Sequence, residues 1–388
     1  MISLAKDTID RSDINRLIDW LQQEPIPKLT KGQLTRKLEV KWAKMLGINY
    51  SVFVNSGSSA ILLSLYSLLL LNRFKNKKVV VSGLSWITDI SSLLQLGLEP
   101  ILCDCNIKDL SLDLHHLELL FKKENPSAVI LVSVLGLVPD MDKIMELCHK
   151  YNVLLIEDVC ESMNSSYCGK KLGTFGDVSV FSTYFGHTIS TIEGGFVCTK
   201  DKELYNVLLS CRNHGWDRDF DDNEKQELKI KYDVDDFNQI YTFYYPGFNL
   251  RSTDLQAFLG LVQLDKLDDY VSKRFKNFKR YRDNLKEVNE LDIILREYDI
   301  VSNMGFPVVS FYRKNLIELF RNNNVEIRPL IAGNMVMQPF WKDKSIYLEN
   351  CDMIHYYGFY LPNHQNLTFD EIDFICNLIL NNGLDSRQ

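Results

Sequence analysis

The sequence lacks a long uninterrupted hydrophobic run and a recognisable leader at its N-terminus. Its longest apolar stretch, residues 61–71, contains two serines and a tyrosine, and it is much shorter than the roughly 20 residues that a membrane-spanning helix needs. The first seven residues have neither the basic nor the apolar block of a signal peptide. We therefore expect a cytoplasmic protein without a membrane segment.

The chain also lacks an excess of positive charge and any Cys-x-x-Cys pair. A net charge of −7 over 388 residues gives no reason to expect a nucleic-acid surface. Of the nine cysteines, only Cys103 and Cys105 stand close together, whereas zinc sites usually show wider and repeated spacing. We expect reduced, mostly buried thiols and no metal site.

Short apolar strands alternate with helices through the first 200 residues. Strands are predicted at 51–54, 78–82, 100–104, 128–134, 153–156, 178–181 and 195–199, with helices at 8–23, 32–46, 60–71, 88–98 and 141–151. Such alternation is typical of an α/β fold with a mostly parallel sheet that helices cover on both faces. Ligands bind such a sheet at the carboxyl ends of its strands.

The pattern changes after residue 251. One long helix is predicted over 253–285, followed by strands near 291–295 and 304–310 and helices at 314–323 and 369–382. We predict two domains, a large α/β domain at residues 1–254 and a smaller α+β domain at residues 255–388. The polar, acidic stretch 212–245 predicts a long loop, either a plain surface excursion or a clamp for a substrate or a second subunit.

A strand, a glycine-containing turn and a helix follow one another around Ser56-Gly57-Ser58-Ser59. Free N–H groups at a helix N-terminus, helped by the helix dipole, bind anions. Gly57 permits a backbone conformation that a side chain would obstruct. The pattern predicts a phosphate cradle, although serine and glycine also occur as plain helix caps.

Two further residues stand at the ligand-binding edge of the predicted sheet. Asp158 closes a buried strand, where a carboxylate needs a cationic partner such as a protonated pyridine nitrogen. The alternative is a helix cap for residues 159–163. Trp86 follows another strand and offers an aromatic face for stacking, unless it belongs to the core.

Residues 182–195 have the shape of a vitamin B6 cofactor site, but position 187 is a histidine. A lysine amine normally holds pyridoxal 5'-phosphate (PLP) covalently at that point. Imidazole cannot form that bond, yet it can move a proton near neutral pH. The substitution argues against simple transamination and favours chemistry with a cofactor that is not covalently held.

Taken in order, these motifs resemble the DegT/DnrJ/EryC1/StrS family of sugar-nucleotide aminotransferases. The resemblance covers nearly the whole chain and rests on residues 55–60, 85–86, 156–162, 173–177, 193–195 and 246–251. It implies the PLP-dependent aspartate-aminotransferase-like fold, fold type I. His187 falls where the family has its lysine, as in the 3-dehydratase branch, and residues 160–162, 212–216 and 328–334 also resemble that branch.

The resemblance also implies roles for single residues. Ligands of the cofactor phosphate would be Gly57, Ser58, Ser182 and, from the other subunit of a homodimer with shared sites, Asn249. Trp86 would stack on the pyridine ring, Asp158 would pair with the ring nitrogen, Glu161 would contact the ring hydroxyl, and His187 would be catalytic. Candidates for binding the sugar nucleotide are His214, Arg218, Arg251, Arg328 and Asn334, because arginine can donate twice to a diphosphate.

The implied activity is removal of the C3 hydroxyl from a nucleotide-linked 4-keto sugar, GDP-4-keto-6-deoxymannose or a heptose relative, in 3-deoxy-sugar biosynthesis. Glutamate would convert PLP to pyridoxamine 5'-phosphate (PMP). Two alternatives stay open: a sugar aminotransferase that uses another lysine, such as Lys170 or Lys171, and a non-catalytic cofactor-binding homologue. No iron–sulfur cluster or reductase partner is expected, because only Cys198 and Cys211 follow the histidine closely.

Overall fold

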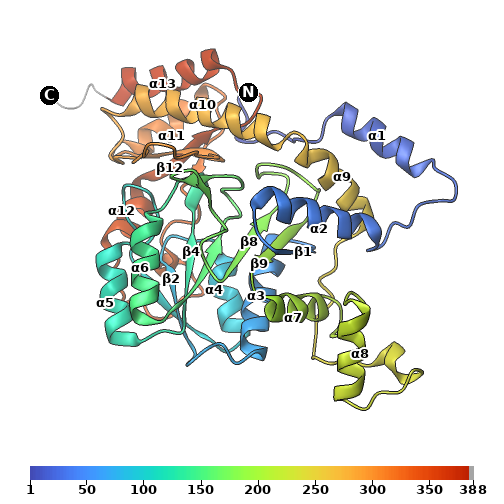
Figure 1. Cartoon of the computed structure of the whole chain (residues 1–388). Coiled ribbons are helices and arrows are strands. Elements are labelled where there is room, and N and C mark those ends of the chain that lie inside the picture. Colours follow the sequence, from blue (N-terminus) through green and yellow to red (C-terminus); the bar gives the residue numbers. More distant parts are fainter. Residues whose placement is uncertain (384–388) are drawn as a thin grey trace.

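The centre of the molecule is a seven-stranded sheet in a computed structural model that describes residues 1–383 (Figure 1). Its strand order is β1 (Tyr50–Val54), β9 (Gly195–Thr199), β8 (Val178–Ser182), β5 (Leu154–Asp158), β4 (Ala128–Val132), β2 (Lys78–Ser82) and β3 (Glu99–Cys103). From β8 to β3 neighbouring strands are parallel, whereas β9 is antiparallel to both of its neighbours. The predicted mostly parallel sheet is confirmed.

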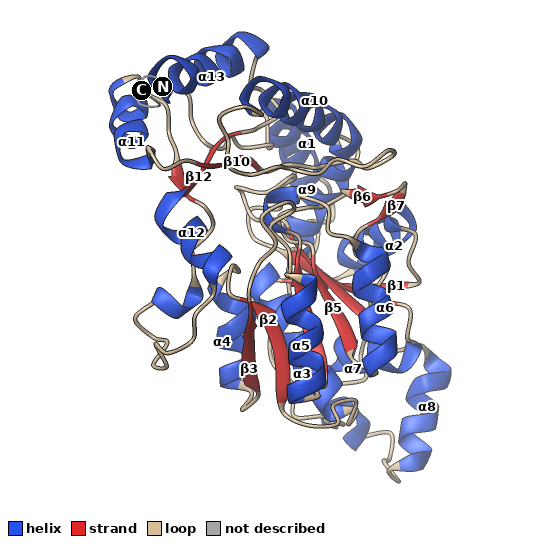
Figure 2. Ribbon diagram, turned by 90° about the vertical axis from the view of Figure 1, so that its left-hand side faces the viewer, coloured by secondary structure: helices blue, strands red, loops and turns tan. Residues whose placement is uncertain are grey.

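Helices surround this sheet (Figure 2). They are α2 (Gln33–Leu46), α3 (Gly57–Leu70), α4 (Ile87–Gln95), α5 (Leu114–Glu124), α6 (Met141–Tyr151) and α7 (Lys202–Arg212). Every residue of β4, β8 and β9 is buried, as expected for a sheet that is covered on both faces. Among the described residues, no helix combines the length and apolar character that crossing a membrane requires.

The C-terminal part forms a second, antiparallel sheet in the order β10 (Gly305–Val309), β12 (Gly358–Pro362) and β11 (Arg328–Pro329). Helices α10 (Leu267–Leu285) and α11 (Arg313–Asn322) both pack against α13 (Phe369–Gly383). The N-terminus returns to this part, since Ile2 pairs with Val325 and α1 (Arg11–Leu21) packs against α9 (Asp254–Leu264). The predicted boundary at residue 254 stays a prediction.

Two predicted elements were wrong. The single helix over 253–285 is two helices, α9 and α10, because the chain turns at Asp265 and Lys266. Residues 291–295 form no strand: the N–H of Ile294 donates to the carbonyl of Lys108 at 3.1 Å. Leu291 and Ile293 are buried there, so their alternation marks burial rather than strand pairing.

The stretch 212–245 is not all loop, because it contains α8 (Asp222–Lys231). Asp221 caps this helix in a reciprocal capping box with Glu224. No residue of α8 is buried, so the sequence has no apolar period that would reveal a helix. The Asp-x-x-Glu spacing was the available signal.

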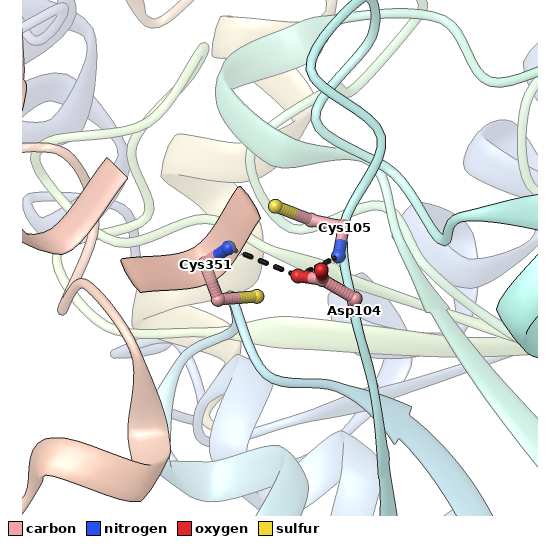
Figure 3. Close-up of side chains that lie close together, drawn as sticks. All are labelled: Asp104, Cys105 and Cys351. Atoms are coloured by element: carbon pink, nitrogen blue, oxygen red, sulfur yellow. Dashed lines mark hydrogen bonds between the residues drawn. The ribbon is translucent and has the colours of Figure 1, made fainter. Parts of the chain in front are cut away.

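A buried cluster joins the end of β3 to helix α12 (Glu349–Tyr357). The side chains of Asp104, Cys105 and Cys351 lie close together there (Figure 3). The two sulfur atoms and a carboxylate oxygen of Asp104 are within 4.8 Å of one another. Oxygens of the Asp104 carboxylate accept the backbone N–H groups of Asn350 at 3.0 Å and of Cys351 at 2.9 Å. The carboxylate thus caps the first turn of α12 and anchors it to the large sheet.

Candidate active site

A cavity of about 480 Å³ opens at the carboxyl ends of β5 and β8. This is the edge at which ligands were expected. It brings together eight of the predicted site residues: Gly57, Ser58, Trp86, Asp158, Glu161, Ser182, His187 and Arg328. These residues come from separate segments that only the fold places side by side.

The N-terminus of α3 forms one wall of the cavity. Ser56 caps the helix, and its hydroxyl accepts the N–H of Ser59 at 3.0 Å. A Cβ atom on Gly57 would lie 2.8 Å from Cβ of Ser182 and 2.9 Å from Sγ of Cys160, so only glycine fits. The first N–H groups of an α-helix have no partner within the helix, and here they border the cavity beside the Ser182 hydroxyl, which suits an anion such as a phosphate.

Asp158 ends β5 on the cavity wall and is buried. It accepts a hydrogen bond from the N–H of Cys160 at 2.9 Å, and within residues 1–383 no cation pairs with it. Burial raises the pKa of Asp158. A buried carboxylate that lacks a cation favours a cationic ligand. Trp86, whose side chain is 52% exposed, lines the same cavity and leaves an aromatic face free for stacking.

Glu161 lies further along the same wall, in the turn after β5. Its carboxylate accepts the N–H of Leu135 at 2.6 Å. Burial raises the pKa of Glu161 to about 7, and the neighbouring Asp158 carboxylate adds to the increase. At neutral pH this group is therefore poised to share a proton with an acidic hydroxyl.

His187 lies half-buried on the cavity wall, in the loop between β8 and β9. Its N–H donates to the carbonyl of Tyr184 at 2.9 Å, and its carbonyl accepts from Nη2 of Arg274 at 3.0 Å. Burial lowers the pKa of His187 to about 4, and the charge of Arg274 lowers it further. The imidazole is therefore neutral at physiological pH and able to accept a proton.

Five predicted residues do not line the cavity: Asn249, His214, Arg218, Arg251 and Asn334. Asn249 is exposed, and its side-chain oxygen accepts a hydrogen bond from Nε of Arg251 at 2.9 Å. The guanidinium carbon of Arg218 lies 3.7 Å from the centre of the Trp216 ring. Asn334 is fully buried, and its amide holds Asp352 and the N–H of Val336. The predicted roles of these five residues stay predictions.

Several cavity residues were not predicted. Leu4 and Ala5 line the cavity because Ile2, just before them in the chain, pairs with Val325. Glu326 lies between them and Arg328: it accepts the N–H of Leu4 at 3.0 Å and a bond from Arg328 at 2.9 Å. Tyr360, on β12, closes the cavity near these groups. No local motif marks such residues, because their role depends on contacts across the whole chain.

No lysine lines the cavity within the described residues. Nζ of Lys170 lies 3.9 Å from the centre of the Phe175 ring. Nζ of Lys171 donates to the carbonyl of Met45 at 2.7 Å. Both lysines belong to the short strand β7 (Lys170–Lys171) and are engaged away from the cavity. Neither stands in for an amine at position 187.

The chain belongs to the DegT/DnrJ/EryC1/StrS aminotransferase family, whose sequence model matches residues 7–380. The fold is the PLP-dependent aminotransferase-like fold that the resemblance implied, because solved structures of this type match it with TM-scores of 0.82 to 0.87.

Among known proteins, the chain is 32% identical to the GDP-4-keto-6-deoxy-D-mannose 3-dehydratase of Escherichia coli, over 89% of this chain and 92% of that protein. It is 30% identical to the enzyme of the same name from Yersinia pseudotuberculosis, with 97% of each chain covered. A solved structure of GDP-4-keto-6-deoxymannose-3-dehydratase, a histidine mutant with bound GDP-perosamine, matches with a TM-score of 0.87 and 28% identity over 98% of this chain and 100% of that one.

Proposed function

We propose that this protein is a PLP- and PMP-dependent 3-dehydratase that removes the C3 hydroxyl of a nucleotide-linked 4-keto sugar, with glutamate as amino donor. The observation that carries the proposal is the position of His187 on the wall of a cavity whose residues fit PLP. No lysine of the described chain lines this cavity. The two most similar curated relatives reported above bear the name of this activity. A structure of such an enzyme holds a PLP-glutamate adduct, and another holds hydrated PLP.

The residues of the cavity fit the cofactor. Gly57, Ser58 and Ser182 would hold the phosphate at the N-terminus of α3, where a side chain on Gly57 would fill the space. Trp86 would stack on the ring, Asp158 would pair with the ring nitrogen and Glu161 would contact the ring hydroxyl. When bound, PMP supplies an amine for the 4-keto group and a protonated ring that accepts electrons.

His187 would move the protons of the reaction. Its neutral imidazole, with a pKa lowered to about 4 chiefly by burial, can take a proton from carbon C4′ of the cofactor. The imidazolium can then protonate the C3 hydroxyl, which is otherwise a poor leaving group. Position 187 also offers no amine that could bind the cofactor covalently and displace an amino sugar. Hydrolysis would therefore release the 3-deoxy-4-keto sugar together with ammonia.

The second subunit of a homodimer would complete the site. Arg251 donates a hydrogen bond to the side chain of Asn249 outside the cavity, and Arg218 is exposed. Asn249 would reach the cofactor phosphate of the other subunit, as the family resemblance implies, and Arg218 and Arg251 would reach a sugar nucleotide only across the same interface. In its own subunit, Arg328 would meet the substrate on the cavity wall. Asn334 and His214 stay candidates, and a cytoplasmic location stays a prediction.

GDP-4-keto-6-deoxymannose is the substrate that the names of the relatives favour, and a heptose relative would undergo the same chemistry. The test is mass spectrometry of this sugar nucleotide after incubation with the protein, PLP and glutamate. We expect loss of one oxygen, with ammonia and 2-oxoglutarate formed. An amine in place of the keto oxygen would overturn the proposal in favour of an aminotransferase, the activity class of the GDP-perosamine synthases, which are 27% identical or less.

A further inference from the structure

A second carboxyl group lies directly behind Asp158. Asp89 belongs to the first turn of α4, three residues after Trp86, and its N–H donates to the carbonyl of Trp86 at 3.2 Å. Its side chain is completely buried. The carboxyl groups of Asp89 and Asp158 lie within hydrogen-bonding reach of each other. The site therefore contains a pair of buried carboxyl groups, of which only Asp158 lines the cavity.

This pair is short of hydrogen-bond donors. Within the described chain, neither carboxylate oxygen of Asp89 accepts a hydrogen bond of good geometry. The donors to Asp158 are the N–H of Cys160 at 2.9 Å and the thiol of the same residue, and neither reaches Asp89. Two ionised carboxylates in contact, buried and without a cation, would repel each other strongly. One proton held between them removes that repulsion and converts two acceptors into a donor and an acceptor.

The surroundings decide which group keeps the proton. Burial, Asp158 and Glu161 all raise the pKa of Asp89, well above its ordinary value. Burial also raises the pKa of Asp158, but the thiol of Cys160, the N–H of Cys160 and the contact with Asp89 act in the opposite direction. Asp89 is therefore the acid of the pair, and Asp158 is the carboxylate. The same division of roles occurs wherever two carboxyl groups share one proton.

We propose that Asp89 is a positioning residue, which as a protonated acid donates a hydrogen bond to Asp158 and holds it as a single oriented anion that faces the cofactor ring nitrogen. This inference rests on the proposed role of Asp158. It assigns a function to a buried residue that touches neither cofactor nor substrate. The charge balance at the floor of the cavity is then one anion for one pyridinium.

The substitutions Asp89→Asn and Asp89→Leu separate this role from simple filling of space. The asparagine amide can still donate to Asp158, whereas leucine is of similar size and cannot donate. A hydrogen bond to a charged group is worth roughly a factor of 10 to 100 in affinity. We expect PLP to bind Asp89→Asn within about twofold of the unchanged protein and to bind Asp89→Leu at least about tenfold more weakly.

The matched control is Asp109→Asn, which removes another buried carboxylate whose pKa burial raises. Asp109 accepts from Ser111 and does not line the cavity, so PLP affinity should not change. The measurement is a titration of the apo protein with PLP, followed by the quenching of tryptophan fluorescence. Equal affinities of Asp89→Leu and the unchanged protein, or equal weakening in Asp89→Asn and Asp89→Leu, would overturn the proposal.

A second readout does not depend on the cofactor. The infrared spectrum of the apo protein at neutral pH should contain C=O absorption of protonated carboxylic acids, one component from Asp89 and one in part from Glu161. Asp89→Asn should remove the Asp89 component, whereas Asp109→Asn should leave that component in place. Its presence unchanged in Asp89→Asn would contradict the proposal, even if Asp89→Leu failed to fold. If instead Asp158→Asn bound PLP normally, the proposed role of Asp158 would fail, which is a different outcome.

Discussion

Two adjacent carboxylates of β5 lie in very different surroundings. Glu157 is buried, and its oxygens accept the backbone N–H groups of Gly173, Phe175 and Gly176 at 2.7, 2.8 and 2.7 Å. On the cavity side, one oxygen of Asp158 accepts the backbone N–H of Cys160, and no cation of the described chain pairs with this carboxylate. The first carboxylate is saturated by the protein itself, whereas the second keeps its capacity for a ligand.

Two buried arginines repeat this contrast. Arg212 pairs with Glu39 and Asp219 and also donates to the carbonyl of Phe53. Arg274 is as deeply buried, but it donates only to the carbonyl of His187 and to Gln365, and within the described residues no carboxylate pairs with it. A buried charge without a counterion is costly, and here it stands beside the proposed catalytic residue.

Asp158→Asn should have the largest effect. The amide cannot neutralise a pyridinium, so the ring would lose its proton and much of its power to accept electrons. We expect turnover to fall by at least about a hundredfold, in line with the loss of one electrostatic group from an active site. Steady-state kinetics measures this fall, and unchanged unfolding of the apo protein in urea would show that the fold is intact.

Glu157→Gln should reverse that pattern. The amide group turns an acceptor into a donor and faces three N–H groups that need acceptors, so we expect stability to fall by about 1–3 kcal/mol. Turnover per folded molecule should stay near its original value. Urea unfolding followed by circular dichroism measures the loss. A hundredfold loss of turnover without any loss of stability would break the contrast between the two carboxylates.

Glu161 should make the stability of the apo protein depend on pH. Its pKa is raised to about 7, first by burial and then by Asp158, so the folded state holds a proton that the unfolded state releases near pH 4.5. Stability should therefore decline as pH rises from about 4.5 through 7, by about 3 kcal/mol from this group. Thermal unfolding across this range would test it, with Glu161→Gln losing that part of the slope.

Arg274→Met should give the smallest effect. Without the guanidinium charge, the pKa of His187 should rise above about 4. The acidic limb of the turnover–pH profile would then move to higher pH, because protonated imidazole cannot accept a proton. Arg274→Lys keeps the charge and should keep the limb in place. A limb that moved equally in both variants would show that geometry, not charge, matters at this position.

The strands of the large sheet, most helices and eight of the residues that line the cavity could be predicted from the sequence because each is marked locally. Apolar runs mark the buried strands, and Gly57, Asp158 and His187 stand at strand ends or in a short motif. The contact of Asp89 with Asp158 could not be predicted, because it joins the first turn of α4 to the end of β5, two segments far apart in the sequence. The same holds for Leu4 and Glu326, which are brought together from opposite ends of the chain. Helix α8 was missed because none of its residues is buried.

The central claim is that histidine in place of lysine at position 187 makes this site a dehydratase. The most direct test compares the unchanged protein and His187→Lys on GDP-4-keto-6-deoxymannose with PLP and glutamate, with both products resolved by mass spectrometry. We predict the 3-deoxy-4-keto sugar from the unchanged protein, and from His187→Lys no dehydration but some amino sugar. Dehydration at an unchanged rate in His187→Lys would contradict the account.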